Sequence, residues 1–382
     1  MEASELIEII SLGEDSKHQH KINFTNPQKL SEEIIAFSNT LGGMIIIGVD
    51  DNGVIIGLTQ DDIRRLNQMI SNVASTHVRP PVNPIVENIL INNKLIMIIK
   101  ISEGISKPYM DNNGAIIVKN GADKRKVTSR EEIQRMFQSA GLIHGDEIPA
   151  NGITIADLDY EYFSQFLFKE YNEKIEQNSE SLSRLLENMS LARDGIMNIA
   201  GALLFSKFPQ FRLPVFMIKA VSYPAEIIDE NNYIDSQDIT GKLSDIFQKA
   251  IGFILNNLKR IQKEKGVNST GELEIPRITL EELLINALVH RDYFISAPIR
   301  LFIFSDRIEI LSPGHLPNNL TIENIKNGIS NIRNPIIASF ASKLLPYRGL
   351  GNGIRRALQA YQKISFFDDR EGNLFKVVIY KQ

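Results

Sequence analysis

Apolar and polar positions follow one another along this chain in two periods, one typical of helices and the other of strands. Residues 44–49 form a short isoleucine-rich run, the pattern of a strand that is covered on both faces. Residues 60–78 and 242–258 instead place apolar side chains at helical spacing. Both periods recur from one end of the chain to the other, so we expect an α+β fold.

The clearest succession of elements is predicted over residues 1–140. Gly42 and Gly43 supply backbone freedom before the strand at 44–49, and Asp51-Asn52-Gly53 predicts a hairpin turn followed by a return strand. The other elements expected here are helices over 2–12, 27–37 and 60–78, strands at 85–91, 94–101 and 115–119, and a helix from the N-cap Ser129 to about residue 139.

The rest of the chain shows a second series of elements after residues 141–152, whose Gly, Pro and acidic residues indicate a linker. We expect helices ending at 171 and spanning 178–189, 242–258, 279–293 and 335–345, and strands at 199–208, 215–222, 299–304, 307–311 and 373–380. At 382 residues the chain is too long for one ordinary core. We therefore expect three parts: residues 1–140, an α/β middle region at 141–270 and a C-terminal part at 271–382.

Composition narrows the class of protein. The chain has no cysteine, which excludes disulfides and thiolate metal sites. Its net charge of −4 argues against binding nucleic acid through the whole surface, so such contacts must come from local basic patches. The first ten residues carry acids where a signal peptide needs basic residues, and no apolar run approaches the roughly 18 residues of a membrane span. We expect a cytoplasmic protein with no membrane partner.

Three segments of the first 140 residues occur in a distinctive order. Residues 13–21 read GEDSKHQHK, residues 36–58 read AFSNTLGGMIIIGVDDNGVIIGL, and a helix start follows at 129–137. This order resembles the Schlafen-type AlbA domain, in which a helix ending A-F-x-N-x-x-G-G leads into a strand ending G-V-D-D. The resemblance implies a Schlafen/AlbA-like mixed α/β domain over 1–140 that binds nucleic acid, with DNA expected in preference to RNA.

The same resemblance offers an alternative metal-dependent nuclease site. In nuclease members a Glu, a second Glu five residues later and the second Asp of G-V-D-D bind a divalent metal. Glu14 and Asp51 match, but Gln19 stands at the second Glu position. An amide oxygen is a poorer ligand for a hard dication than a carboxylate, so nuclease activity is the weaker expectation. Without it, Glu14 is a surface or capping residue and Asp51 a turn former.

Residues 119–130, KNGADKRKVTSR, concentrate positive charge against the single acid Asp123. The segment resembles the closing motif of the same family, which implies a phosphate-contacting loop at a helix N-terminus. The alternative is a solvated run of charge. The residues expected to contact nucleic acid are Lys119, Lys124, Arg125, Lys126 and Arg130.

A second motif lies at residues 279–293, TLEELLINALVHRDY. Glu282, Asn286 and His290 are spaced four residues apart, so they share one face of the expected helix. Leucines and an alanine occupy the other faces, so the polar stripe must look into a cavity or solvent. The motif resembles the N-box of the GHKL ATPases, which implies a GHKL-like α/β sandwich over residues 271–382.

The GHKL resemblance also implies roles for particular residues. Asn286 would coordinate the magnesium ion of ATP, Glu282 would act as general base for water, and His290 would lie beside them in the cofactor site. In the family a D-x-G-x-G turn holds the adenine amine. Here Ser312 stands at the place of its Asp, and Gly314 follows in the same turn; Asp306 is the alternative if the register differs.

Residues 348–356, RGLGNGIRR, resemble the second glycine box of that family, whose backbone N–H groups close over phosphates. Gly349, Gly351 and Gly353 at alternate positions allow a phosphate to approach the backbone closely. Residues 324–367 contain seven Lys or Arg, Arg333 among them, and no Asp or Glu. This imbalance fits a polyphosphate pocket or a nucleic-acid face. ATP and Mg are therefore the expected cofactors.

The middle region, with its pattern A-L-L-F-S-K-x-P followed by I-K-A-V, resembles RecG-like proteins that join an AlbA-type domain to an ATPase-like module. We expect a scaffold there that offers an oligomerisation surface, and hence a homo-oligomer. No G-x-x-x-x-G-K-[ST] is present, so a P-loop helicase motor is not supported.

Three functions remain open. The first is a nucleic-acid-binding regulator that uses ATP as a switch or hydrolyses it slowly; intact Glu282 and Asn286, and Gln19 in place of an acid, favour it. The second is the metal-dependent nuclease. The third, indicated by Ser312, is a scaffold that has lost both ligands and serves assembly. We favour the first and, by resemblance, expect a transcriptional regulator or a defence-associated factor.

Overall fold

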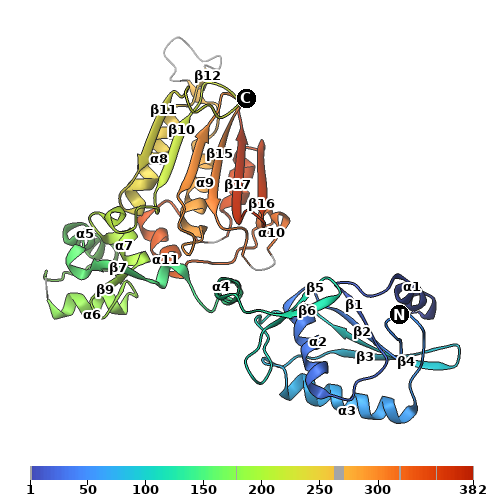
Figure 1. The fold of residues 1–382 in the computed structure, drawn as a ribbon. Helices are drawn as coiled ribbons and strands as arrows, with labels where there is room; N and C mark the ends of the chain where they lie inside the picture. The colour runs from blue at the N-terminus through green and yellow to red at the C-terminus, as the bar shows by residue number, and fades with distance from the viewer. Residues whose placement is uncertain (1, 178, 262–270, 318–319, 350, 382) are drawn as a thin grey trace. The chain divides into compact units, whose positions relative to one another are not determined.

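In the computed structural model the chain forms two compact units, Met1–Leu142 and Ile143–Gln382 (Figure 1). The structure describes residues 2–177, 179–261, 271–317, 320–349 and 351–381. Helices and strands occur together in each unit, which confirms the expected α+β class. Among the described residues, no helix combines the length and apolar character that crossing a membrane requires.

The first unit is built on a mixed four-stranded sheet in the order β1-β2-β4-β3, with β1 parallel to β2 and the other pairs antiparallel. A separate hairpin, β5–β6, follows. The elements of this unit are α1 (Ala3–Leu12), β1 (His18–Lys21), α2 (Pro27–Asn39), β2 (Gly43–Ile47), α3 (Gln60–Thr76), β3 (Ile85–Ile91), β4 (Lys94–Ile101), β5 (Ile117–Asn120), β6 (Asp123–Lys126) and α4 (Arg130–Ser139).

Strand β2 is covered on both faces, as its isoleucine run predicts. Ile45 and Ile47 belong to a core cluster with α2 and α3, whereas Ile46 and Val49 belong to a second cluster with Leu6 of α1. Burying one such side chain contributes about 1.5–3 kcal/mol, so the run holds two layers to the same sheet.

The prediction of a return strand after the Asp51-Asn52-Gly53 turn is wrong, because the described residues form no strand there. Only an isolated bridge joins Val49 to Ile55, because both edges of β2 are already taken, one by β1 and the other by β4. Residues 119–130 also differ from the expected loop. They contain the turn and second strand of the β5–β6 hairpin, and the Ser129 N-cap of α4 is present as predicted.

The second unit contains these elements: η1 (Gly145–Glu147), β7 (Pro149–Thr154), η2 (Ile155–Asp157), α5 (Tyr160–Tyr171), α6 (Glu180–Asn188), β8 (Ala192–Arg193), β9 (Ile196–Asn198), α7 (Ile199–Phe205), η3 (Pro209–Phe211), β10 (Ile218–Ser222), β11 (Asp235–Ile239), α8 (Leu243–Asn256), β12 (Arg260–Ile261), β13 (Glu272–Leu273), α9 (Arg277–His290), β14 (Ile299–Ile303), β15 (Arg307–Pro313), α10 (Ile322–Lys326), α11 (Pro335–Leu344), α12 (Gly353–Ala360), β16 (Ile364–Asp369) and β17 (Leu374–Tyr380).

The strand predicted at 199–208 is wrong, because Ile199–Phe205 forms helix α7. Asn198 caps the helix by accepting a hydrogen bond from Gly201 N at 2.7 Å. Every residue of α7 is buried, so the segment lacks the one-sided pattern that marks a helix in sequence. A short run of this kind has the same apolar signature as a buried strand.

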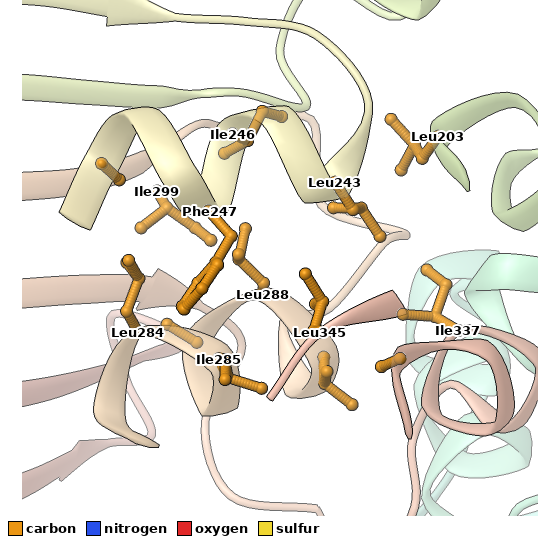
Figure 2. Packing of buried hydrophobic residues seen from close by; sticks show 14 of the residues in the cluster. Leu203, Leu243, Ile246, Phe247, Leu284, Ile285, Leu288, Ile299, Ile337 and Leu345 are labelled. Carbon is orange, nitrogen blue, oxygen red and sulfur yellow. The ribbon is translucent and has the colours of Figure 1, made fainter. Parts of the chain in front are cut away.

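A six-stranded sheet organises the second unit, in the order β11-β10-β14-β15-β17-β16. Helices α8 and α9 lie against it: Phe247 of α8 packs among Leu284 and Leu288 of α9 and Ile299 of β14 (Figure 2). This arrangement is the expected α/β sandwich. Strands β10 and β11 come from the expected middle region, yet they belong to the same sheet and the same hydrophobic cluster as the C-terminal strands. The division at residue 270 stays a prediction.

A buried carboxyl group near the start of this unit makes its stability depend on pH. Asp146 of η1 is fully buried and accepts a hydrogen bond from Ile337 N in the first turn of α11, at 2.9 Å. Its other oxygen has no hydrogen-bond partner among the described residues. Burial raises the pKa of Asp146 from 3.8 to about 6.

Asp146→Asn is expected to raise the free energy of unfolding by about 1–3 kcal/mol at about pH 7. A carboxyl whose folded pKa is raised contributes its full stability below about pH 3.8 and loses it as the pH rises through about 6. Urea denaturation followed by circular dichroism should therefore show a smaller gain at about pH 5 than at about pH 8. The exposed neighbour Glu147, changed to Gln, is the control; an equal gain there would contradict the prediction.

Candidate functional site

Helix α9 carries the polar stripe expected from its sequence. Glu282, Asn286 and His290 line one pocket, whereas Leu284 and Ile285 on the other side of the helix are fully buried in the core. Helix α12 packs beside α9, and Thr279 of α9 donates a hydrogen bond to Ala357 O of α12 at 3.3 Å. The apolar side of α9 thus fixes the helix in the unit and leaves its polar side facing a hollow.

The other residues expected in the cofactor site reach the same pocket from three further segments: the turn after β15, the segment before α11, and the glycines that lead into α12. Its empty space is about 1020 Å³, counting the open mouth. Every residue expected in the cofactor site lines it, namely Glu282, Asn286, His290, Gly314, Arg333, Gly349, Gly351 and Gly353. The structure therefore brings together residues that are up to 71 positions apart in the chain.

Glu282 is buried and forms an ion pair with Arg356 of α12, with 2.5 Å between Oε1 and Nη2. Burial raises the pKa of the Glu282 carboxyl, and the positive charges of Arg356 and Arg348 oppose this rise. The pair engages Oε1 of the carboxylate, so Glu282 is held beside Arg356 in this arrangement. Its role as general base stays a prediction.

Asn286 is oriented by its own helix. Its Nδ2 donates a hydrogen bond to Glu282 O, one turn earlier, at 2.7 Å. That bond uses the amide N–H and leaves Oδ1 outside the side-chain hydrogen bonds found within the described parts of the chain. A side-chain carbonyl oxygen is the kind of ligand that magnesium takes from a protein.

The glycine segment, named here for Gly349, Gly351 and Gly353 and ending at Arg356, lies directly against α9. A Cβ atom on Gly353 would lie 2.6 Å from Glu282 Oε2 and 3.0 Å from Asn286 Nδ2. Gly351 has φ +70°, and a Cβ there would lie 2.8 Å from Gly328 O. Only glycine allows this approach, so the backbone of the segment forms one wall of the pocket.

The other end of the pocket, near His290, is held by internal hydrogen bonds. Ser312 is buried and donates to Ala287 O at 3.3 Å. Arg333 donates to His315 O at 2.7 Å and to His290 O at 3.4 Å. Burial and the charge of Arg333 lower the pKa of His290 to about 4, so its imidazole is neutral at neutral pH.

The residues present fit a nucleoside polyphosphate. Among the described residues of the pocket wall, three arginines, Arg333, Arg348 and Arg356, accompany a single acid, Glu282, which favours a polyanion. Arg333 and Arg356 each keep a buried Nε without a partner in the described chain. The apolar walls suit an aromatic base and come from Leu283, Ala287, Ile310, Leu316, Phe366, Phe375 and Val377.

In the first unit the alternative nuclease residues also meet, but lysines join them. Glu14 accepts hydrogen bonds from the side chain of Gln19 and from His20 N, the latter at 2.7 Å. Lys21 Nζ lies 3.4 Å from Glu14 and 3.8 Å from Asp51. An ammonium group thus lies between the two carboxylates, and the described residues contain no cluster of three or more His, Asp or Glu suited to a metal ion.

Lys119 is an internal link and not a surface cation. It is buried, and its Nζ donates to Gln19 Oε1 at 2.6 Å and also to Ala122 O. It lies 5.0 Å from the centre of the Phe37 ring. Burial lowers the pKa of Lys119. The side chain therefore ties the β5–β6 turn to β1.

Most of the other expected nucleic-acid contacts are paired with acids. Lys124 lies 3.0 Å from both Glu32 and Glu33. Arg125 forms a two-point pair with Glu132 at 2.7 and 3.0 Å, and Arg130 lies 3.7 Å from Glu131. Lys126 is exposed on β6. These pairs cancel much of the positive charge that the sequence concentrates here.

Each of the two units matches a known family. Residues 14–128 match the family "Schlafen, AlbA_2", and residues 296–376 match the family "Putative ATP-dependent DNA helicase recG C-terminal". The chain is thus similar to a Schlafen AlbA_2 domain in its first unit and to a RecG-type C-terminal domain in its second. These two similarities indicate a nucleic-acid-related protein with an ATPase-like domain. The second match covers the turn after β15 and the glycine segment and begins after α9.

Among solved structures, the DIP2311 protein from Corynebacterium diphtheriae is 21% identical with a TM-score of 0.49, over 99% of this chain and 80% of that chain. The N-terminal domain of a "Putative ATP-dependent DNA Helicase RecG-related Protein" from Nitrosomonas europaea is 21% identical with a TM-score of 0.24, over 34% of this chain and 96% of that chain. No curated protein matches the chain.

Sequence reasoning missed two residues of these sites. Lys21 lies in the 13–21 motif, and Arg356 ends the glycine segment, so both stood inside segments already singled out. Only their contacts, with Glu14 and Glu282 respectively, show what they do. A basic residue at the end of each recognised segment was the available signal.

Proposed function

We propose that this protein is a nucleic-acid-associated regulator whose RecG-type domain binds ATP with magnesium, as a switch or with slow hydrolysis. One observation supports this most. Residues chosen from separate segments of the sequence for this chemistry all line the same pocket. Glycines and polar residues without a shared function would have no reason to converge in this way.

The chain's own residues suggest how the ligand would be held. Asn286 Oδ1 would face the magnesium ion, while backbone N–H groups at Gly351 and Gly353 and the guanidinium of Arg348 would hold phosphate oxygens. ATP supplies a transferable phosphoryl group. The pairing of Glu282 with Arg356 sets a positive charge against the expected general base, which favours a switch or a slow ATPase.

The Schlafen AlbA_2 domain would supply the nucleic-acid contact, with DNA as the preferred partner and Lys124, Arg125, Lys126 and Arg130 as candidates, because Lys119 is buried. Transcriptional regulation, a cytoplasmic location and a homo-oligomer complete the proposal. A metal-dependent nuclease is the weaker candidate, because the ammonium group of Lys21 lies between Glu14 and Asp51.

Asn286→Ala is expected to weaken binding of magnesium–ATP by about 10-fold or more, because it removes a ligand of the metal ion. Fluorescence titration of the full chain with a fluorescent ATP analogue and magnesium measures the affinity, and thermal shift with ATP provides a second readout. Asn256→Ala makes the same change on the exposed side of α8 and serves as control.

Two outcomes would count against the proposal. If the unmodified chain binds no nucleotide with magnesium, the ATP site is lost as an explanation, and an assembly scaffold becomes the better reading. If it binds but Asn286→Ala binds equally well, the ligand lies elsewhere in the chain or in another orientation.

A further inference from the structure

The turn that follows α7 places two phenylalanines in solvent. Phe208 is 66% exposed and Phe211 is 81% exposed, the two largest values among the aromatic residues that the structure describes. Their rings stack on each other, with 5.2 Å between the ring centres and 19° between the ring planes. Exposed apolar side chains that are gathered in one place, unlike scattered ones, indicate an interaction site.

The backbone that carries these rings is anchored to the body of the unit. Pro209 is buried and begins η3. The side chain of Gln210 donates to Phe216 O at 3.0 Å and to Gly241 O at 2.9 Å, and it accepts from Gly241 N at 2.9 Å. The rings therefore project from a fixed support, and their exposure is a property of the fold.

Positive charge flanks the two rings. Lys207 and Arg212 are exposed, and residues 207–212 contain no acid. The acids of the adjoining segment have partners of their own. The Asp157 carboxylate accepts a hydrogen bond from the backbone at the start of η2 at 2.8 Å. Asp159 lies near Lys207 but forms its ion pair, at 2.9 Å, with the lysine that precedes α8.

Exposed aromatic rings between two cations fit a single-stranded nucleic acid. Its bases are flat and stack on aromatic side chains, and its phosphates meet the cations. Stable protein interfaces instead span about 20–30 residues on each side, and lysine is depleted from their cores. In a duplex the faces of the bases are covered by neighbouring bases, so the rings would find nothing to stack on. The patch therefore favours unpaired bases.

We propose that residues 207–212 form a contact site for single-stranded nucleic acid. The ring of Phe211 stacks on a base, Phe208 supports that ring from behind, and Lys207 and Arg212 meet the neighbouring phosphates. Ring faces accept any base, so the site takes single strands of DNA and of RNA. It lies in the second unit and goes beyond the proposed function, which places the nucleic-acid contact in the first.

The test is fluorescence anisotropy of the full chain with labelled oligo(dT) and oligo(U) of about 20 nucleotides. Phe211→Ala is expected to weaken binding of both by at least about 5-fold, because it removes one stacking contact. Phe211→Leu keeps an apolar side chain but no flat face, so it should lose as much, whereas Phe211→Trp should bind at least as tightly as the unmodified chain. Unchanged binding in Phe211→Ala or Phe211→Leu would overturn the inference.

Two further variants separate stacking from charge. Phe367 is 45% exposed on β16, and Lys376 Nζ already lies 5.0 Å from the centre of its ring, so Phe367→Ala should leave binding unchanged. Replacing Lys207 and Arg212 together by Gln should lower the slope of log Kd against log salt by about 1.4, since each phosphate contact on a single strand contributes about 0.7. An unchanged slope would contradict the role of the two cations.

Two other results would also overturn this site. The first is failure of the unmodified chain to bind either oligonucleotide; the titration with magnesium–ATP and a duplex DNA titration still judge the proposed function by themselves. The second comes from sedimentation velocity. If Phe211→Ala dissociates an oligomer and leaves oligonucleotide binding unchanged, the two rings form an interface between copies of the chain.

Discussion

Arg356→Ala is expected to lower the free energy of unfolding by about 2–4 kcal/mol, because it leaves a buried carboxylate without its partner. The side chain of Glu282 is 7% exposed and that of Arg356 is 25% exposed, so the pair is largely shielded from water. Their atoms lie 2.5 Å apart. Urea denaturation followed by far-UV circular dichroism measures the loss.

The dependence of this loss on pH has a definite sign. Burial already raises the pKa of Glu282 with Arg356 in place, and removing the arginine takes away a charge that lowers it. A carboxyl with a raised folded pKa stabilises the folded state at low pH and loses that contribution as the pH rises. The destabilisation in Arg356→Ala should therefore be smaller at about pH 5 than at about pH 8.

Two further variants show whether the ion pair is the cause. Arg355 is the exposed neighbour on α12, so Arg355→Ala removes the same charge without touching Glu282 and should cost little. Glu282→Gln combined with Arg356→Ala should be less destabilised than the sum of the single changes, with a coupling of about 2 kcal/mol. Additive losses would show that the pair contributes nothing specific.

Gly353→Ala is expected to weaken nucleotide binding by about 30-fold or more while changing stability by less than about 1 kcal/mol. A methyl group at this position meets Glu282 Oε2 at 2.6 Å and Asn286 Nδ2 at 3.0 Å. Both side chains must shift, and Asn286 is the residue proposed to meet the metal ion. The better helix propensity of alanine at the start of α12 offsets part of the crowding.

A second glycine provides the matched control for this experiment. Gly252 lies within α8, and a Cβ added there meets no atom within 4 Å. Gly252→Ala is therefore expected to stabilise the protein by about 0.5–1 kcal/mol and to leave the fluorescence titration unchanged. Equal binding by Gly353→Ala and the unmodified chain would mean that nucleotide does not occupy the wall formed by Gly353.

These contacts connect the proposed switch to the geometry of one helix pair. Helix α12 carries Gly353 at its start and Arg356 one turn later, and both face α9. Phosphate groups held at the glycine segment would compete with Glu282 for Arg356. Phosphate binding would then release the Glu282 carboxylate from Arg356, and phosphate release would restore the ion pair.

In the first unit the residues of the recognised nuclease motif also come together, but positively charged side chains accompany them. The 13–21 and 48–51 segments meet as the resemblance implies, yet Lys21 and Lys119 bring ammonium groups into the cluster of Glu14, Gln19 and Asp51. The basic run at 119–130 is similarly balanced by Glu32, Glu33 and Glu132. Sequence proximity to a motif does not show which charges are already paired.

Elements with one-sided patterns or clear caps were predictable. The period of α3 and α8 and the cap of α4 are local properties, so they survive in the folded chain. Helix α7 was not, because a segment buried all round has no polar face from which to read its period. The return strand after β2 failed for a different reason, since its place was taken by β1 and β4 from elsewhere in the chain.

The pocket was predictable in part. Glu282, Asn286 and His290 share a helical face by spacing alone, and the glycines at 349, 351 and 353 could be recognised by type and order. Their meeting in one pocket was an expectation from resemblance, and the partners Arg356 and Ser312–Ala287 could not be derived from spacing. Such pairs join elements whose separation along the chain carries no information about distance.

The sequence by itself determined the mixed class of the fold, the double-covered strand β2, the polar stripe of α9 and the absence of any thiolate chemistry, because periodicity, turn residues and composition act over a few neighbouring positions. Only the tertiary structure decided which charges neutralise one another, which carbonyl oxygens are already taken, and that β10 and β11 share a sheet with the C-terminal strands. Those outcomes depend on packing of distant segments, where a side chain's partner is set by the fold and not by its neighbours in sequence.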